Sequence, residues 1–216
     1  MHPLSNFVVT TAPATEPIEV DEAKLHLRVD INDDDFLIQS LITAAREHVE
    51  AVTGRALVTR SMDCYRDQFP GVPPYPRSAV IELPKPPLAS ITSFQFVDSA
   101  ATTHTWTVSG SNLLNELGTI NAHIDTANEP GRIILAYSQV WPSNILKTAN
   151  ALKIGITAGY GSAGSVPLRF RSAMLLLIGH WYENRESVRF ATMREALPLP
   201  MGVDMLLAPL KNWCFA

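Results

Sequence analysis

Three glycines in the last third of the chain have the spacing of a phosphate-binding loop. Gly159, Gly161 and Gly164 stand as G-x-G-x-x-G in ALKIGITAGYGSAGSVPL, after a predicted strand and before a predicted helix. In a dinucleotide-binding fold such glycines let the backbone approach a pyrophosphate at a helix N-terminus. The preceding strand, however, alternates apolar with polar residues, whereas the parallel strands of that fold are apolar throughout. The glycines are therefore predicted to form a strand-to-helix turn, and we expect no cofactor.

Two other stretches have part of the spacing of a metal site. DINDDD, residues 30–35, matches the first positions of a calcium loop, but Asp35 stands where glycine is required and Leu41 where glutamate is required. The three successive carboxylates at its end fit the N-terminus of a following helix better, because orphan N–H groups and the helix dipole favour negative charge there. His180 and Glu183 are three residues apart on a predicted helix, without a second such pair. We predict no metal site.

The sequence contains no set of residues that would carry catalysis. There is no G-x-S-x-G nucleophile elbow and no H-E-x-x-H zinc motif, and neither Cys64 nor Cys214 stands near a predicted base. Two widely separated cysteines also do not make a disulfide framework. The sequence therefore predicts a protein that is not an enzyme.

The composition is that of a globular protein with unevenly distributed charge. The 216 residues are 46% hydrophobic and 18% charged, and the net charge of −4 does not favour a nucleic-acid binder. Residues 1–54 hold three basic and ten acidic residues, a net charge of −7. Residues 165–216 hold six basic and four acidic ones, a net charge of +2. The acidic part is either a solvated face or one side of a contact between neighbouring copies.

The sequence gives no sign of export or membrane insertion. Its start lacks a basic segment followed by an apolar one, so we predict no signal peptide. Its longest apolar run is far shorter than the ~20 residues that span a bilayer. We expect a soluble protein made in the cytoplasm.

Helical periodicity at both ends of the chain encloses a stretch with β periodicity. Residues 37–49 carry two adjacent, mostly apolar rows at helical spacing, and Gly54 follows where a C-cap belongs. Asp21 is the predicted cap of a short preceding helix. From about Leu57 to Ala158, short β-rich runs alternate with proline and glycine turns. Pro167 suits the first turn of a second long helix that is apolar on nearly all sides.

These patterns predict an α+β fold with two domains. The N- and C-terminal segments, residues 1–56 and 160–216, are expected to pack together as one helical domain, because each carries an apolar stripe that must be covered. Residues 57–159 are expected to form an inserted β domain. Its pairing should be mainly antiparallel, since no long helical pattern interrupts the strands.

The order of these segments resembles that of one protein family, the head–tail connector proteins of tailed bacteriophages and gene transfer agents. These proteins are also called adaptor or head-completion proteins. The similar segments are VDEAKLHLRVD, DDDFLIQSLITAAREHVEAVTGRAL, IELPKPPLASITSFQFVD, GITAGYG, VPLRFRSAMLLLIGHWYENRE and LPLPMGVDMLLAPLK. The resemblance covers nearly the whole chain. It implies a structural virion protein without catalytic residues or cofactors.

The resemblance also implies partners. Family members form a ring, commonly twelvefold, beneath the portal protein at one vertex of the capsid. The ring receives the tail or a stopper protein, and DNA passes through its channel without sequence-specific binding. A membrane is not among the expected partners. The chain is then expected in the virion neck, after synthesis in the cytoplasm of the bacterial host.

Two other functions stay open on the sequence alone. One is a virion β-domain protein that binds a tail or surface partner. The other is a small nucleotide-binding enzyme that uses Gly159, Gly161 and Gly164. Sizing distinguishes a ring from a monomer, and a dinucleotide titration tests the enzyme.

A ring requires contacts between unlike faces of neighbouring copies. The acidic N-terminal and basic C-terminal parts offer such faces, and electrostatic attraction would steer their encounter. The candidate interface residues are Asp33, Asp34, Asp35, Arg169, Arg171, Arg185, Trp213 and Phe215.

Overall fold

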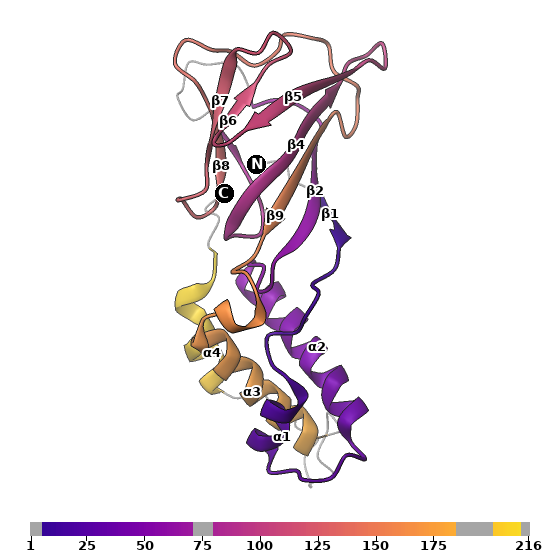
Figure 1. Cartoon of the computed structure of the whole chain (residues 1–216), viewed down its shortest axis with the longest axis vertical. Coiled ribbons are helices and arrows are strands. Elements are labelled where there is room, and N and C mark those ends of the chain that lie inside the picture. The colour runs from indigo at the N-terminus through magenta and orange to yellow at the C-terminus, as the bar shows by residue number, and fades with distance from the viewer. Residues whose placement is uncertain (1–5, 71–79, 185–200, 213–216) are drawn as a thin grey trace, which may run out of the picture. The chain divides into compact units, whose positions relative to one another are not determined.

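The chain divides into two compact units (Figure 1). The computed structural model describes residues 6–70, 80–184 and 201–212. One unit, here the helical unit, comprises Ala14–Val58 and Tyr160–Lys211. The other, here the β unit, comprises Met1–Pro13, Thr59–Gly159 and Asn212–Ala216. The predicted α+β class is confirmed. Helices come from the N-terminal and C-terminal parts of the chain, and most strands lie between them in the sequence.

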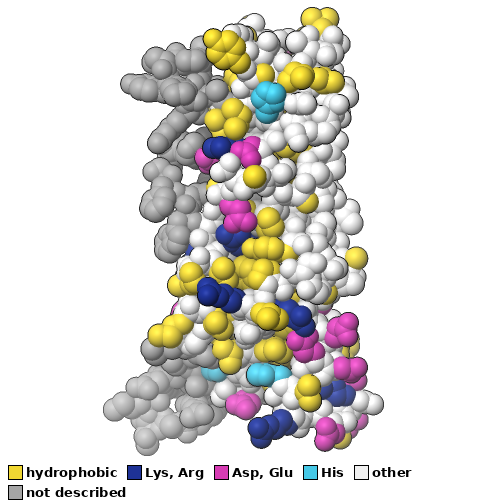
Figure 2. Space-filling model, turned by 60° about the vertical axis from the view of Figure 1, so that its left-hand side comes forward, with side chains coloured by type: hydrophobic (Ala, Val, Ile, Leu, Met, Phe, Trp, Pro, Cys, Tyr) yellow, Lys and Arg dark blue, Asp and Glu magenta, His cyan; other side chains and the backbone are white. Residues whose placement is uncertain are grey.

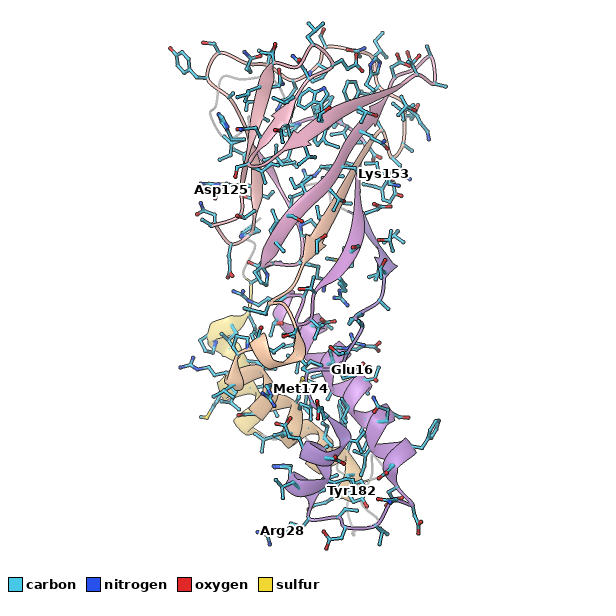
Figure 3. All side chains as sticks on the ribbon, viewed as in Figure 1. Glu16, Arg28, Asp125, Lys153, Met174 and Tyr182 are labelled. Carbon is cyan, nitrogen blue, oxygen red and sulfur yellow. The ribbon has the colours of Figure 1, made fainter. Side chains whose placement is uncertain are left out.

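Within the described residues, four α-helices and two short 3-10 turns form the helical unit. They are α1 (Val20–Leu27), α2 (Asp35–Thr53), η2 (Ala163–Ser165), α3 (Leu168–Glu183), α4 (Met201–Leu207) and η3 (Ala208–Leu210). Helix α3 contacts α1, α2 and α4, and it lies between α2 and α4 (Figure 1). Met174 and the other buried residues of α3 therefore form the centre of this unit's core (Figure 3).

Helix α2 buries the face that its apolar spacing predicts. One predicted row is fully buried: Ile38, Ile42, Ala45 and Val49. The adjacent row lies at the edge of that face, where Leu41 is half-buried and Ala44 is exposed. Gly54 is the C-cap, as predicted, with a left-handed φ of 71°, and its N–H donates to the carbonyl of Glu50 at 3.1 Å.

Two helix starts differ from the predicted ones. Glu19 occupies the cap position of α1, so the prediction that Asp21 caps this helix is wrong. The extended backbone of Glu19 lets its carbonyl accept the N–H of Ala23 at 3.0 Å, and this bond starts the helix before Asp21. Asp21 lies in the first turn, where its charge still favours the helix dipole. Pro167 occupies the cap position of α3, one residue before the predicted first turn.

The described part of the β unit forms one sheet of nine strands. They are β1 (Asn6–Thr11), β2 (Arg60–Arg66), β3 (Val80–Glu82), β4 (Leu88–Val97), β5 (Thr103–Ser109), β6 (Asn112–Leu114), β7 (Ile120–Asp125), β8 (Arg132–Leu135) and β9 (Leu152–Ala158). The order across the sheet is β1-β2-β9-β4-β5-β6-β7-β8-β3. All pairings between these strands are antiparallel, which confirms the predicted type of sheet.

The first strand lies outside the segment predicted as β. Residues 1–56 were assigned to the helices, but β1 pairs antiparallel with β2, with Phe7 opposite Cys64 and Val9 opposite Met62. The strand sequence NFVVTT is rich in β-branched and aromatic residues, which fit a pleated surface. The first strand therefore belongs to the β unit.

Candidate assembly surfaces

The glycine turn joins β9 to η2 and α3. Gly159 and Gly161 have φ values of 133° and 118°, which L side chains rarely adopt. Gly164 has no positive φ, and nothing lies within 4 Å of where its Cβ would be. The neighbours of β9 on both sides, β2 and β4, run antiparallel to it, so the βαβ unit of a dinucleotide-binding fold is not formed around this turn. The glycines serve a strand-to-helix turn, as predicted.

The acidic segment before α2 binds groups of its own unit. Asp34 occupies the cap position without a side-chain capping bond, and its Oδ2 accepts a hydrogen bond from the Tyr182 hydroxyl at 2.5 Å. Tyr182 lies at the same end of the helical unit as this segment (Figure 3). Asp35 Oδ1 lies 2.8 Å from the ammonium of Lys24. Asp33 is exposed. The predicted charge at the helix start is present, but two of the three carboxylates also hold helices together.

No group of three or more His, Cys, Asp and Glu side chains within residues 6–70, 80–184 and 201–212 is arranged to hold a metal ion. His180 is half-buried on α3, and its carbonyl accepts a hydrogen bond from the Asn184 amide at 2.9 Å. Glu183 is exposed on the same helix. His180 and Glu183 are therefore not part of a metal-binding group within the described residues.

The predicted basic residues differ in their surroundings. Arg169 is exposed near the start of α3 and forms no ion pair with the described residues. The guanidinium of Arg171 lies 2.6 Å from the carboxylate of Glu22 on α1 and is thus used within the unit. Three predicted interface residues lie outside the described residues: Arg185, Trp213 and Phe215. Arg169 and Asp33 remain the pair of predicted residues with exposed charges.

A buried ion network, which the sequence analysis missed, uses more of the N-terminal acidic residues. Arg46 on α2 donates from Nε to Glu16 at 2.8 Å and from Nη1 to Glu50 at 3.1 Å. Glu16 lies beside α2 (Figure 3), and the other oxygen of Glu50 accepts the N–H of Leu57 at 2.9 Å. Burial lowers the pKa of Arg46, but the neighbouring carboxylates outweigh this effect and raise it above its usual value. Two of the ten acidic residues of residues 1–54 are thus used inside the unit.

Large apolar side chains are exposed in both units. In the helical unit the most exposed ones lie on α1, on the α1–α2 turn and at the outer sides of α2, α3 and α4: Leu25, Ile31, Phe36, Leu168 and Met205. In the β unit they lie in loops: Leu117, Tyr137, Val140 and Ile145. Exposed apolar side chains that stand singly are ordinary on protein surfaces, whereas a contiguous group of them can mark a contact with another macromolecule.

Part of this architecture matches the model of a known family. Residues 17–86 carry α1, α2, β2 and β3. This segment matches the family model described as phage gp6-like head-tail connector protein. The predicted resemblance is confirmed. No curated protein matches the chain.

Solved structures share the fold over almost the full length. A chain in "Virion of native gene transfer agent (GTA) particle" has a TM-score of 0.72 and 22% identity, covering 97% of this chain and 97% of that chain. A chain in "Neck of empty GTA particle computed with C6 symmetry" has a TM-score of 0.71 and 23% identity, covering 98% and 97%. A third, in "Neck of native GTA particle computed with C12 symmetry", has a TM-score of 0.66 and 22% identity, covering 99% and 98%.

The matches support a structural connector role. The family and the particles with the same fold are structural, so the prediction that the chain is not an enzyme is confirmed. No helix in the described parts of the chain has the length and apolar character needed to cross a membrane.

Proposed function

We propose that this protein is a head–tail connector of the virion neck, which forms a ring beneath the portal and joins the capsid to the tail or to a stopper protein. The observation that carries the proposal is the agreement between the family match over residues 17–86 and the fold match over 97–99% of the chain. The two comparisons depend on different information, sequence in one and fold in the other, and both lead to the neck of a tailed particle.

The symmetry of the similar particles supports a ring. Two of the matching chains come from necks computed with C6 and C12 symmetry. A cyclic ring requires that one face of each copy meet a different face of the next. We expect a monomer or a mixed population in isolation, because a weak contact gains from the high effective concentration that the portal provides.

The ring surrounds the channel through which DNA passes. A net charge of −4 gives the chain no general attraction to phosphates, which suits a channel that must release DNA. The protein acts in the neck of a virion that is assembled in the bacterial cytoplasm, between the portal on one side and the tail or stopper on the other.

The loops of the β unit offer a contact for one of these neighbours. Three hydrogen bonds hold the loops together: Ser99 N–H to the Ile145 carbonyl at 2.8 Å, His104 to Glu116 at 2.8 Å, and the Asn121 amide to the Val140 carbonyl at 3.3 Å. These bonds hold the loops in place. The most exposed apolar side chains of the loops belong to Leu117 and Tyr137. We assign these loops to the contact with the tail or stopper protein.

Removal of this protein during particle assembly tests the proposal. Capsids that form without it are expected to remain without tails, and the protein supplied separately should restore tail attachment. Normal tail attachment in its absence would contradict a connector role. A titration with a dinucleotide is the matched test of the alternative enzyme, and saturable micromolar binding would favour that alternative.

A further inference from the structure

Three exposed apolar side chains stand at or next to the turn between α1 and α2, beside residues that hydrogen bonds hold in place. The nearly buried ammonium of Lys24 donates to Asn32 Oδ1 at 2.6 Å and to Asp35 Oδ1 at 2.8 Å. Each of these three residues stands next to an exposed apolar residue in the sequence. These apolar neighbours are called the turn patch: Leu25, Ile31 and Phe36. Lys24 thereby fixes the turn that displays them.

The turn patch has the properties of a protein contact. Leu25 and Phe36 are 82% and 85% exposed, although α2 buries another face in its own core. The rim of the patch carries the exposed carboxylates of Asp30 and Asp33, together with Arg28, which lies at this end of the unit (Figure 3). Apolar patches with a polar rim mark sites of protein association. The partner surface that fits should be apolar and should carry a basic group.

The outer sides of α3 and α4 form such a surface. Leu168 and Leu176 are exposed eight residues apart on α3, about 80° apart around the helix. Leu176 reaches α4, because its Cδ1 lies 3.5 Å from where a Cβ would stand at Gly202. Met205 is exposed on the following turn of α4. Leu168, Leu176 and Met205 are here called the α3–α4 patch.

The α3–α4 patch carries the complementary charge. Arg169 is exposed directly beside Leu168, which is 74% exposed. Asp204 is the exposed carboxylate beside Met205, so the basic group stands at the α3 end of the patch. Figure 2 shows the side of the helical unit on which α3 and α4 lie, where hydrophobic side chains gather next to Lys and Arg side chains.

We propose that the turn patch of one copy packs on the α3–α4 patch of the next copy in the ring. The inference rests on the proposed connector function, and it names the two unlike faces that a ring contact requires. Phe36 is the central side chain of the contact because it is aromatic and the most exposed of the six patch residues. Asp33 lies toward Arg169 of the neighbouring copy and sets the register of the two faces.

Cross-linking in assembled particles tests the inference. The double variant Phe36→Cys, Met205→Cys is made in a Cys214→Ser background, because Cys64 is buried and does not interfere. Treatment with a short bismaleimide is expected to give a ladder of covalent oligomers that extends to the complete ring. Each single-cysteine variant should give no ladder, because it lacks one of the two faces.

Charge and size variants provide a second readout. Phe36→Asp is expected to lower the yield of tailed particles about tenfold or more, as removal of a central contact residue does. Ala44→Asp introduces the same charge on an exposed site of α2 outside the patch and should leave the yield unchanged. Arg169→Glu should lower the yield, and addition of Asp33→Arg should restore it.

The outcomes separate this inference from the connector function. If a map of the particle vertex shows a ring of this protein and the double-cysteine variant gives no ladder, the pairing of these patches is wrong and the connector function stands. Equal yields for Phe36→Asp and Ala44→Asp would also overturn the pairing. If the vertex contains no ring of this protein, the connector function itself fails.

Discussion

Replacement of Arg46 by methionine should destabilise the helical unit strongly. The Arg46 side chain is buried and binds Glu16 at 2.8 Å and Glu50 at 3.1 Å. Glu50 is only 4% exposed and has other interactions besides Arg46, among them the hydrogen bond from the N–H of Leu57. Removal of one partner from a buried ion pair costs about 3–5 kcal/mol, because the remaining charge is left uncompensated. Glu16 is partly exposed and can be hydrated, and Glu50 keeps other partners, so we expect the loss at the lower limit, about 3 kcal/mol.

Chemical denaturation followed by circular dichroism measures this loss. The fluorescence of Trp181 reports on the helical unit as a second signal, since its ring packs edge-on against His48 with the two ring centroids 6.0 Å apart. The matched control is Glu47→Gln, because Glu47 is exposed and lies 3.5 Å from Arg46. A surface pair of this kind contributes at most about 1 kcal/mol. If Arg46→Met costs no more than Glu47→Gln, the reasoning about the buried network is wrong.

Three further predictions concern other parts of the chain. Gly161→Ala should lower the melting temperature because its φ is 118°, whereas Gly164→Ala should not, and equal effects would contradict the description of the turn. The hydrogen bond that the His104 imidazole donates to the Glu116 carboxylate raises the pKa of His104, so the stabilisation by the charged imidazole should be complete below pH ~6.5 and lost as pH rises through the raised pKa. A nuclear magnetic resonance titration checks this, and an unchanged His104 pKa in Glu116→Gln would refute it. Burial raises the pKa of Cys64 to about 12, so iodoacetamide at pH 8 should not label it in the folded protein; rapid labelling seen by mass spectrometry would contradict this.

Elements with strong local periodicity were predictable from the sequence. The apolar spacing of α2 indicates both the helix and its buried row, and Gly54 marks its end because a left-handed C-cap favours glycine. Most central strands follow from alternating residues between turn signals, as in β9 with buried Ile154 and Ile156. The antiparallel arrangement follows from the absence of long helical patterns between them.

Elements that depend on distant partners were not predictable in the same way. The strand β1 forms against β2, more than fifty residues later in the chain, and its sequence has no alternation to reveal a buried face. By contrast, β2 alternates buried Met62 and Cys64 with polar residues, a pattern that is present in the sequence itself. Register between distant segments is a property of the packed sheet rather than of either segment alone.

The candidate site was only partly predictable for a similar reason. Charge counts identified an acidic N-terminal part, but they do not say which carboxylates are paired inside the fold. Glu16 and Arg46 are thirty residues apart, and only the spacing of Arg46 and Glu50, four residues along one helix, was a local signal. Arg171 and Asp35 are likewise bound within the unit. Arg169 differs from these two paired residues because its side chain is exposed, and the sequence does not show which side chains are exposed.

We propose that copies of this chain form a ring in the neck of a tailed particle. A cryo-electron microscopy map of the capsid vertex, reconstructed with the symmetry of the neck, tests it most directly. The account predicts a closed ring of this chain between the portal and the tail or stopper, with helical units in contact around the DNA channel. A vertex map of complete, tailed particles in which no ring of this chain is present would contradict it.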